Sequence, residues 1–264
     1  MNLHDLLASA RRPPHSVTVP REWSQGRACY GGLMAALLHE AMAAHVPDRP
    51  VRSMAITFVG PAELEVPIDL QVEILREGSA VTSVLARAVQ GGRTMTVVQA
   101  SFGLARESAI SISAMPVAAM KPLAESTALP YLPGVTPEYI RHLDMRWGIG
   151  ALPFSNTPVA GIGGWVQLRD HDRDEPITEA LLLVLGDAWP PALLPYLSQP
   201  APGSSLTWTI EFIQPMPALR SLEWCRYQAV IEHARDGYGH TSAAMWNPEG
   251  ELLAISRQTV TVFG

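Results

Sequence analysis

The chain has 264 residues, of which 47% are apolar and 17% are charged. This composition supplies a sizeable core and excludes an intrinsically disordered protein, and the length corresponds to one or two domains. The formal net charge of −6 argues against a nucleic-acid-binding protein, because such proteins usually carry a basic surface.

Several features predict a cytoplasmic protein without a membrane span. Cys29 and Cys225 lie far apart and form no disulfide pattern, which is typical of a reducing compartment. The first 16 residues contain no apolar signal segment. No run of about 18 apolar residues occurs, so we expect no transmembrane helix.

The first half predicts one helix followed by an antiparallel meander. Apolar residues recur with helical spacing over residues 30–46, and Pro47 ends this helix. Gly91-Gly92 predicts a hairpin turn between the last two strands of the meander. The four predicted strands cover residues 52–59, 68–75, 81–89 and 94–104.

Residues 106–137 differ from the segments on either side. Five prolines interrupt a stretch rich in Ala, Ser and Met that has little periodicity. We expect a linker with little regular structure that crosses between two units and lies on the protein surface. The domain prediction is therefore an N-terminal unit over 1–105, the linker over 106–137 and a C-terminal unit over 138–264.

The second half repeats the order of the first. A strand pair precedes a helix over residues 178–187, which Pro190-Pro191 interrupts. The strands of this half are predicted at residues 139–147, 164–168, 205–213, 222–232, 239–246 and 252–262.

Two spacings support an internal duplication. Gly78 to Gly91 and Gly237 to Gly250 both span 13 residues, and 8 residues separate the second glycine of each pair from Gln99 and Gln258, respectively. We infer that one α+β unit of about 132 residues is duplicated. A helix this apolar must be covered on most sides, and a curled sheet is the simplest cover.

The duplicated pattern resembles a tandem hot-dog protein of the acyl-CoA thioesterase II family. The resemblance implies an α+β double hot-dog fold, in which two antiparallel sheets each wrap around a central helix and a pseudo-two-fold axis pairs the units. The matching motifs are Tyr30-Gly31-Gly32, Phe58-Val59-Gly60-Pro61, Leu75-Arg76-Glu77-Gly78-Ser79, Leu185-Gly186-Asp187-Ala188-Trp189-Pro190-Pro191, Ser205-Leu206-Thr207-Trp208 and Ser256-Arg257-Gln258.

The resemblance implies that Asp187, Ser205 or Thr207, and Gln258 are catalytic. The carboxylate of Asp187 would deprotonate a water that the hydroxyls and the amide hold in place. Asp187 ends an apolar helix, where the helix dipole disfavours an anion, so it is expected either at a site or at a solvated helix end. Ser205 and Thr207 lie two residues apart on one strand, which predicts that both hydroxyls face the same side.

Other residues are candidates for supporting or rival roles. Gly31 and Gly32 begin the first helix, where free backbone N–H groups suit a thioester oxyanion. Glu40 on that helix is a rival general base. The acidic segment 170–175 is interpreted as a solvated loop rather than a metal site, because its acids are contiguous.

The predicted function is hydrolysis of acyl-CoA thioesters, with acyl-CoA as the substrate and no metal or cofactor. The alternative is a non-catalytic protein that binds acyl chains or serves as a scaffold, because Thr207-Trp208 stand where the family usually has Asp-His. An enoyl-CoA hydratase is a weaker alternative, since the chain has no suitable Asp and His pair. Assembly of such double units into a homo-oligomer is left open.

Overall fold

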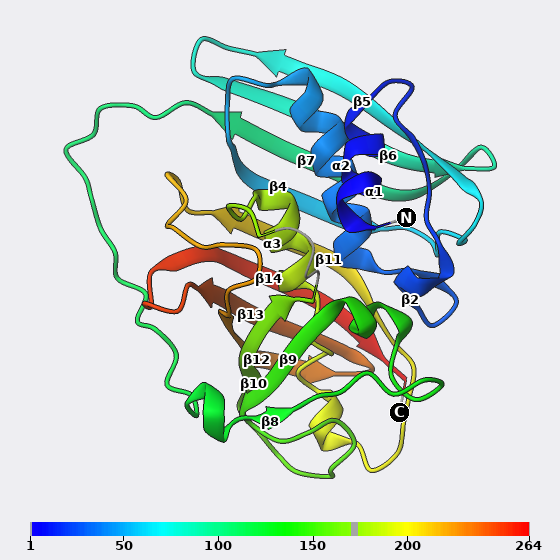
Figure 1. Cartoon of the computed structure of the whole chain (residues 1–264), viewed down its shortest axis with the longest axis vertical. Coiled ribbons are helices and arrows are strands. Elements are labelled where there is room, and N and C mark those ends of the chain that lie inside the picture. The colour runs from blue at the N-terminus through cyan, green and yellow to red at the C-terminus, as the bar shows by residue number, and fades with distance from the viewer. Residues whose placement is uncertain (1, 170–173, 264) are drawn as a thin grey trace.

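A twelve-stranded antiparallel sheet runs through the whole molecule (Figure 1). The computed structural model describes residues 2–169 and 174–263. The strands of the sheet follow the order β1-β5-β6-β7-β4-β11-β14-β13-β12-β10-β9-β8. A separate small sheet pairs β2 (Ser24–Gln25) with β3 (Ala28–Cys29).

The elements of the first half are α1 (Leu3–Arg11), β1 (Ser16–Thr18), η1 (Arg21–Trp23), α2 (Gly31–His45), β4 (Val51–Phe58), β5 (Pro67–Glu77), β6 (Val81–Gln90) and β7 (Arg93–Gly103). The remaining elements are η2 (Leu123–Glu125), β8 (Thr127–Ala128), η3 (Glu138–His142), β9 (Leu143–Ile149), β10 (Gly161–Leu168), α3 (Glu179–Gly186), η4 (Leu194–Tyr196), β11 (Gly203–Phe212), β12 (Cys225–Arg235), β13 (Tyr238–Trp246) and β14 (Leu252–Val262).

The strand order confirms the predicted duplication. In the first half, α2 is followed by four strands arranged as β4-β7-β6-β5, and in the second half α3 is followed by four strands arranged as β11-β14-β13-β12. A strand that precedes the helix extends each set, namely β1 beside β5 and β10 beside β12. The α+β class is likewise confirmed.

The two halves meet edge to edge in one continuous sheet. Strand β4 pairs with β11 in antiparallel register, with Ala55 opposite Thr209. Both strands also pair on their other sides within their own half, so neither is an edge strand at the junction. The two predicted sheets therefore form a single hydrogen-bonded surface.

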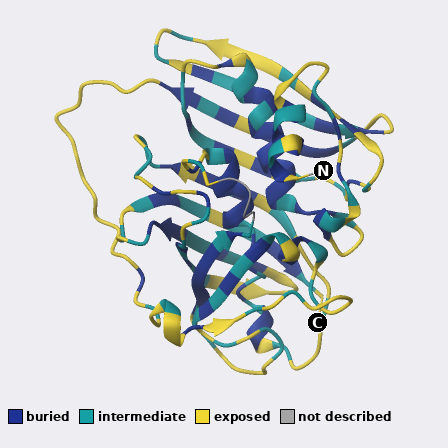
Figure 2. Ribbon diagram, viewed as in Figure 1, coloured by how far each residue is buried: buried dark blue, intermediate teal, exposed yellow. Residues whose placement is uncertain are grey.

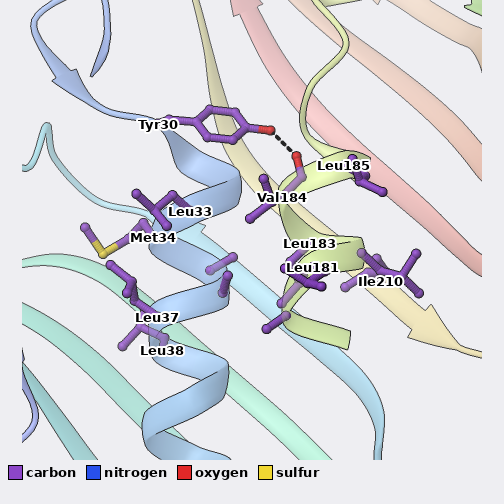
Figure 3. Packing of buried hydrophobic residues seen from close by; sticks show 14 of the residues in the cluster. Tyr30, Leu33, Met34, Leu37, Leu38, Leu181, Leu183, Val184, Leu185 and Ile210 are labelled. Carbon is purple, nitrogen blue, oxygen red and sulfur yellow. Dashed lines mark hydrogen bonds between the residues drawn. The ribbon is translucent and has the colours of Figure 1, made fainter. Parts of the chain in front are cut away.

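Helices α2 and α3 lie side by side in the centre of the molecule (Figure 1). Their directions are opposed, because the Tyr30 hydroxyl at the start of α2 donates to the Val184 carbonyl near the end of α3, at 2.6 Å (Figure 3). Residues 180–186 are all buried, as are residues 32–39. The helices are covered on most sides by the sheet and by each other (Figure 2), which explains why they are apolar nearly all round.

A helix at the N-terminus was not predicted. In α1 the buried residues Leu3, Leu6, Leu7 and Ala10 have the spacing of one helical face, and the Asn2 side chain caps the helix by accepting from the Asp5 amide. This helix packs against α2. The pattern was present in the sequence, but the helix is only nine residues long.

Strand β10 begins three residues earlier than predicted, because its glycines allow close approach of neighbouring strands. Gly164 has a φ of +154°, and a Cβ there would lie 1.9 Å from the Arg146 carbonyl oxygen. Residues 138–142 form the 3-10 helix η3 rather than the start of a strand, so the predicted strand over 139–147 is corrected to β9.

The segment between β7 and η3 carries two short elements, η2 and β8, and it links the two halves (Figure 1). Its second part packs on the second half, where Ala118 and Met120 contact a cluster that contains Trp246. Its first part does not lie against the protein as expected, because Ile110 and Ile112 are 75% and 81% exposed. Among the described residues, no helix is long and apolar enough to cross a bilayer.

The central helix provides a test of this packing. Leu37 on α2 is fully buried, so Leu37→Ala should leave a cavity and lower the free energy of unfolding by about 2–5 kcal/mol. Leu75→Ala on β5 is the control, because that side chain is 46% exposed and its truncation should cost far less. Urea unfolding followed by circular dichroism measures both. Equal losses would contradict the placement of α2 in the core.

Candidate active site

Asp187 caps the C-terminus of α3 and lies against the N-terminus of α2. The sequence suggested an unfavourable position for an anion, since Asp187 ends its own helix. In the structure the opposed helix α2 compensates for this position, because its N-terminus lies against the carboxylate. The Gly32 amide acts on Asp187 as a hydrogen-bond donor. The positive end of the α2 dipole thus compensates the negative end of α3.

Asp187 is half-buried, and its carboxyl has a strongly perturbed pKa. Burial raises its pKa from 3.8 to about 7, although hydrogen bonds from Gln258 and Gly32 act in the opposite direction. A carboxyl whose pKa is near neutrality both accepts and returns a proton easily at physiological pH. Perturbed acids of this kind are typical of functional sites.

Gln258 reaches Asp187 from the last strand of the sheet. On β14 it lies opposite Trp208 on one neighbouring strand and Thr241 on the other, both of which are buried. Its side chain therefore faces the interior, and Nε2 donates to Oδ1 of Asp187 at 2.9 Å. The structure brings these two predicted residues together.

Gln99 is not the counterpart of Gln258, despite the matching sequence spacing. Gln258 lies opposite Trp208, which is four residues before the end of β11. The equivalent residue of β4, four residues before its end, is Met54, and Met54 lies opposite Ala100. The counterpart of Gln258 is therefore Ala100. Gln99 is exposed on the outer face of β7. A register difference of one residue reverses the face, so the amide on the inner face is specific to the second half.

Ser205 and Thr207 do not face the same side. A β-bulge lies between them, because Ser205 is opposite Val260 and Thr207 is opposite Thr259. Thr207 is exposed and alternates with the buried Trp208, so it lies on the outer face of β11. Ser205 lines the same cleft as Asp187. The prediction of two hydroxyls on one water is therefore wrong for Thr207.

Gly31 makes room for the carboxylate, and Gly32 makes room for the Tyr30 side chain and the backbone of α3. A Cβ at Gly31 would lie 2.8 Å from Oδ2 of Asp187, and a Cβ at Gly32 would lie 2.8 Å from the Leu183 carbonyl oxygen. A hydrogen bond from the Gly32 backbone lowers the pKa of Asp187. Gly31 lines the cleft, and the amide of a first helical residue has no acceptor within its helix.

A cleft of about 600 Å³ opens over the carboxylate at the junction of the two halves. Among the described residues that line it, Asp187 is the only acid and Arg27 the only base. Much of the remaining wall is apolar or backbone. The lining residues are Gln25, Gly26, Arg27, Ala28, Cys29, Gly31, Met34, Phe58, Val59, Gly60, Pro61, Ala62, Thr96, Asp187, Pro202, Gly203, Ser204, Ser205 and Leu206.

Tyr30, which the sequence placed in a motif without a role, and Tyr139 hold the backbone around Asp187. The Tyr30 hydroxyl donates to the Val184 carbonyl (Figure 3), and the Tyr139 hydroxyl donates to the Ala188 carbonyl at 3.0 Å. The two rings stack with their centroids 4.0 Å apart. Burial, and then the charge of Asp187, raise the pKa of both hydroxyls, so both remain neutral donors. No sequence pattern assigned this role to either residue, because both lie far from Asp187 along the chain.

The rival base Glu40 lies outside the residues that form the cleft. Burial alone would raise its pKa, but hydrogen bonds and charges from His39 and Arg11 bring the pKa below its ordinary value. Arg11 contacts the carboxylate at 3.0 Å. Of the acidic segment, residues 170–173 lie outside the described residues, and Asp174 pairs with Arg220. Within residues 2–169 and 174–263, no group of three or more metal-ligating side chains occurs.

The fold and the site together define a double hot-dog protein, in which one chain supplies both sheet-wrapped helices and a carboxylate lies at their junction. The model of the acyl-CoA thioesterase N-terminal domain matches residues 19–103, and that of the C-terminal domain matches residues 118–262. The chain therefore belongs to the acyl-CoA thioesterase family, and it is a thioesterase. A comparison with curated proteins found no match.

Solved structures share this fold over most of their length. A conserved protein with the hot dog fold from Alicyclobacillus acidocaldarius has 22% identity and a TM-score of 0.80, with 94% of this chain and 92% of that chain covered. The tesB protein of Mycobacterium avium subsp. paratuberculosis has 18% identity, a TM-score of 0.78 and complete coverage of both chains. An acyl-CoA thioesterase II from Mycobacterium marinum has 21% identity and a TM-score of 0.72, covering 94% and 92%.

The hydrogen bond from Gln258 predicts a shift in the pH dependence of catalysis. Gln258→Ala removes a donor that stabilises the carboxylate, so the pKa of Asp187 should rise. The acidic limb of the kcat/KM profile should move to higher pH by about one unit. Gln99→Ala is the matched control and should leave the profile unchanged. An unshifted limb in Gln258→Ala would show that Asp187 does not control the pH dependence.

Proposed function

We propose that this protein hydrolyses acyl-CoA thioesters to a free acid and CoA, with Asp187 as the general base. The observation that supports the proposal is a buried carboxyl with a pKa of about 7 at the base of a cleft, held by Gln258 and by the start of α2. Ser205 lines the same cleft and would position the attacking water together with Asp187.

The reaction follows from these positions. Asp187 removes a proton from the water as its oxygen forms a bond to the thioester carbonyl carbon. The tetrahedral intermediate then expels the CoA sulfur as the C–S bond breaks. The proton on Asp187 passes to this sulfur, which leaves CoA as a neutral thiol and returns the carboxylate. No covalent acyl-enzyme forms in this scheme.

The Gly31 amide is the donor best placed for the oxyanion of the intermediate. It belongs to the first residue of α2, lines the cleft and lies beside the Asp187 carboxylate. A donor that is fixed before reaction stabilises developing negative charge without reorganisation. Gln258 has a different role in this scheme, because its Nε2 group is already bound to Asp187 and orients that carboxylate.

The alternative of a non-catalytic acyl-binding protein rested on Thr207 and Trp208. Thr207 lies on the outer face of β11, and Trp208 is buried near Gly186, so neither residue lines the cleft. The unusual pair therefore leaves the proposed chemistry intact. Absence of hydrolysis with acyl-CoA of every chain length would nevertheless restore the binding-protein interpretation.

Asp187→Asn tests the general base directly. The change keeps the size of the side chain but removes its ability to accept a proton, so kcat should fall by about 10²–10⁴-fold. Release of CoA thiol from a panel of acyl-CoA substrates measures the effect. Ser205→Ala should also lower kcat, and its effect should shrink in the Asp187→Asn background, because groups that act on one water work as a unit.

Glu40→Gln is the control for that experiment, since it alters the rival carboxylate. It should retain activity, because Glu40 is paired with Arg11 and lies outside the cleft. Full activity of Asp187→Asn together with a loss in Glu40→Gln would overturn the assignment.

Asp187→Asn should also change how stability depends on pH. Folding raises the pKa of Asp187 from 3.8 to about 7, so the folded state keeps a proton that the unfolded state loses. Stability of the wild type due to this group is full below pH 3.8 and is lost as the pH rises through about 7. Asn does not titrate, so Asp187→Asn should not lose this stability as the pH rises. Its melting temperature relative to wild type should be higher at pH 8 than at pH 5.

A further inference from the structure

Arg27 lies at the rim of the cleft that contains Asp187. It belongs to the turn between β2 and β3, where Gly26 adopts a φ of +62° that favours glycine. This turn brings Arg27 over the cleft as the only basic residue among the described residues that line it. Its side chain is exposed, so the guanidinium is accessible to a bound molecule.

A second cleft adjoins the first and contains Arg93. Both clefts are bordered by Arg27 and by residues 59–61, which follow strand β4. Arg93 begins strand β7 immediately after the Gly91-Gly92 turn. The two clefts therefore lie on either side of residues 59–61, with Asp187 in one, Arg93 in the other and Arg27 at the edge of both.

Both guanidinium groups are available for a ligand. Among the ion pairs and side-chain hydrogen bonds of the described residues, none involves Arg27 or Arg93. The other arginines nearby are engaged, because Arg21 pairs with Glu65 and Arg141 pairs with Glu138. The cleft with Arg93 contains one acid, Glu63, against the two arginines.

The local charge contrasts with that of the whole chain. The protein has a formal net charge of −6, which repels an anionic substrate. Two arginines that have no ion-pair partner among the described residues and lie near Asp187 would therefore offset this repulsion locally. Guanidinium groups match phosphate oxygens with two parallel hydrogen bonds and remain charged at all physiological pH values.

We propose that Arg27 and Arg93 bind the phosphate groups of the CoA moiety. This inference rests on the proposed function, and it adds an orientation for the substrate. The thioester lies at Asp187, the pantetheine arm crosses the rim at residues 59–61, and the nucleotide end lies in the cleft beside Arg93. The acyl chain extends the other way, toward the apolar wall that includes Met34 and Phe58.

Paired substrates test this proposal. Arg27→Ala, Arg93→Ala and the double variant are assayed with one acyl group carried either on CoA or on N-acetylcysteamine, which has no phosphate. Each single change should raise KM for acyl-CoA about tenfold with little change in kcat, because one charge-assisted contact is lost. Hydrolysis of the N-acetylcysteamine ester should be unaffected.

Arg76→Ala is the matched control. Arg76 is exposed on β5 and lies opposite Ser83, whereas the hairpin that carries Arg93 is at the other end of the same ladder, near Val89. This variant loses the same charge far from the proposed path. Its KM for acyl-CoA should remain that of the wild type. An increase in KM equal to that of Arg93→Ala would show that the loss of any positive charge has this effect, which would contradict a specific contact with Arg93.

Direct binding separates this inference from the proposed function. Isothermal titration calorimetry with CoA should show weaker binding to the double variant than to the wild type, and the salt dependence of binding should decrease. This measurement remains informative if the protein hydrolyses no acyl-CoA. Unchanged CoA affinity in the double variant would overturn the phosphate assignment while leaving hydrolysis by Asp187 untouched. Equal losses with both substrates would also contradict it.

Discussion

The carboxylate of Asp187 lies between the end of one buried helix and the start of another, and this contact connects the fold to the chemistry. Helices α2 and α3 are antiparallel, so the positive N-terminal end of α2 lies beside the negative C-terminal end of α3 and compensates it. Gly31 allows the carboxylate within 2.8 Å of the place that a Cβ would occupy, and Gly32 donates to it. Burial still dominates, and the pKa of about 7 follows from that balance.

Duplication produced two similar halves but a single site. The C-cap of α3 is Asp187, whereas the C-cap of α2 is Val46, which is buried. In the first half, the position on β7 that is equivalent to Gln258 on β14 is occupied by Ala100. Both polar groups are thus replaced by apolar ones in the first half. The first half instead contributes the start of α2 and the rim at residues 59–61.

The site depends on supports that come from distant parts of the chain. Tyr30 and Tyr139 fix two carbonyls on either side of Asp187, and the β4–β11 junction aligns the two helices. A buried acid without such partners would be costly, since desolvation of a charge is compensated only by hydrogen bonds and nearby dipoles. The stability lost around Asp187 as the pH rises is therefore part of the same arrangement that keeps it reactive near neutrality.

The sequence by itself determined the duplicated α+β pattern, the two apolar helices, the resemblance to thioesterases and the candidate residues Asp187, Ser205 and Gln258. These follow from local periodicity, turn residues and motif order, all of which are properties of short segments. Tertiary structure alone decided that Thr207 faces outward, because one bulge in β11 changes the face, and that Gln99 is no counterpart of Gln258. It also decided the pKa of the Asp187 carboxyl. The dipole that Asp187 faces and the Gly32 amide it accepts from belong to a helix about 150 residues away along the chain, so no local pattern records them.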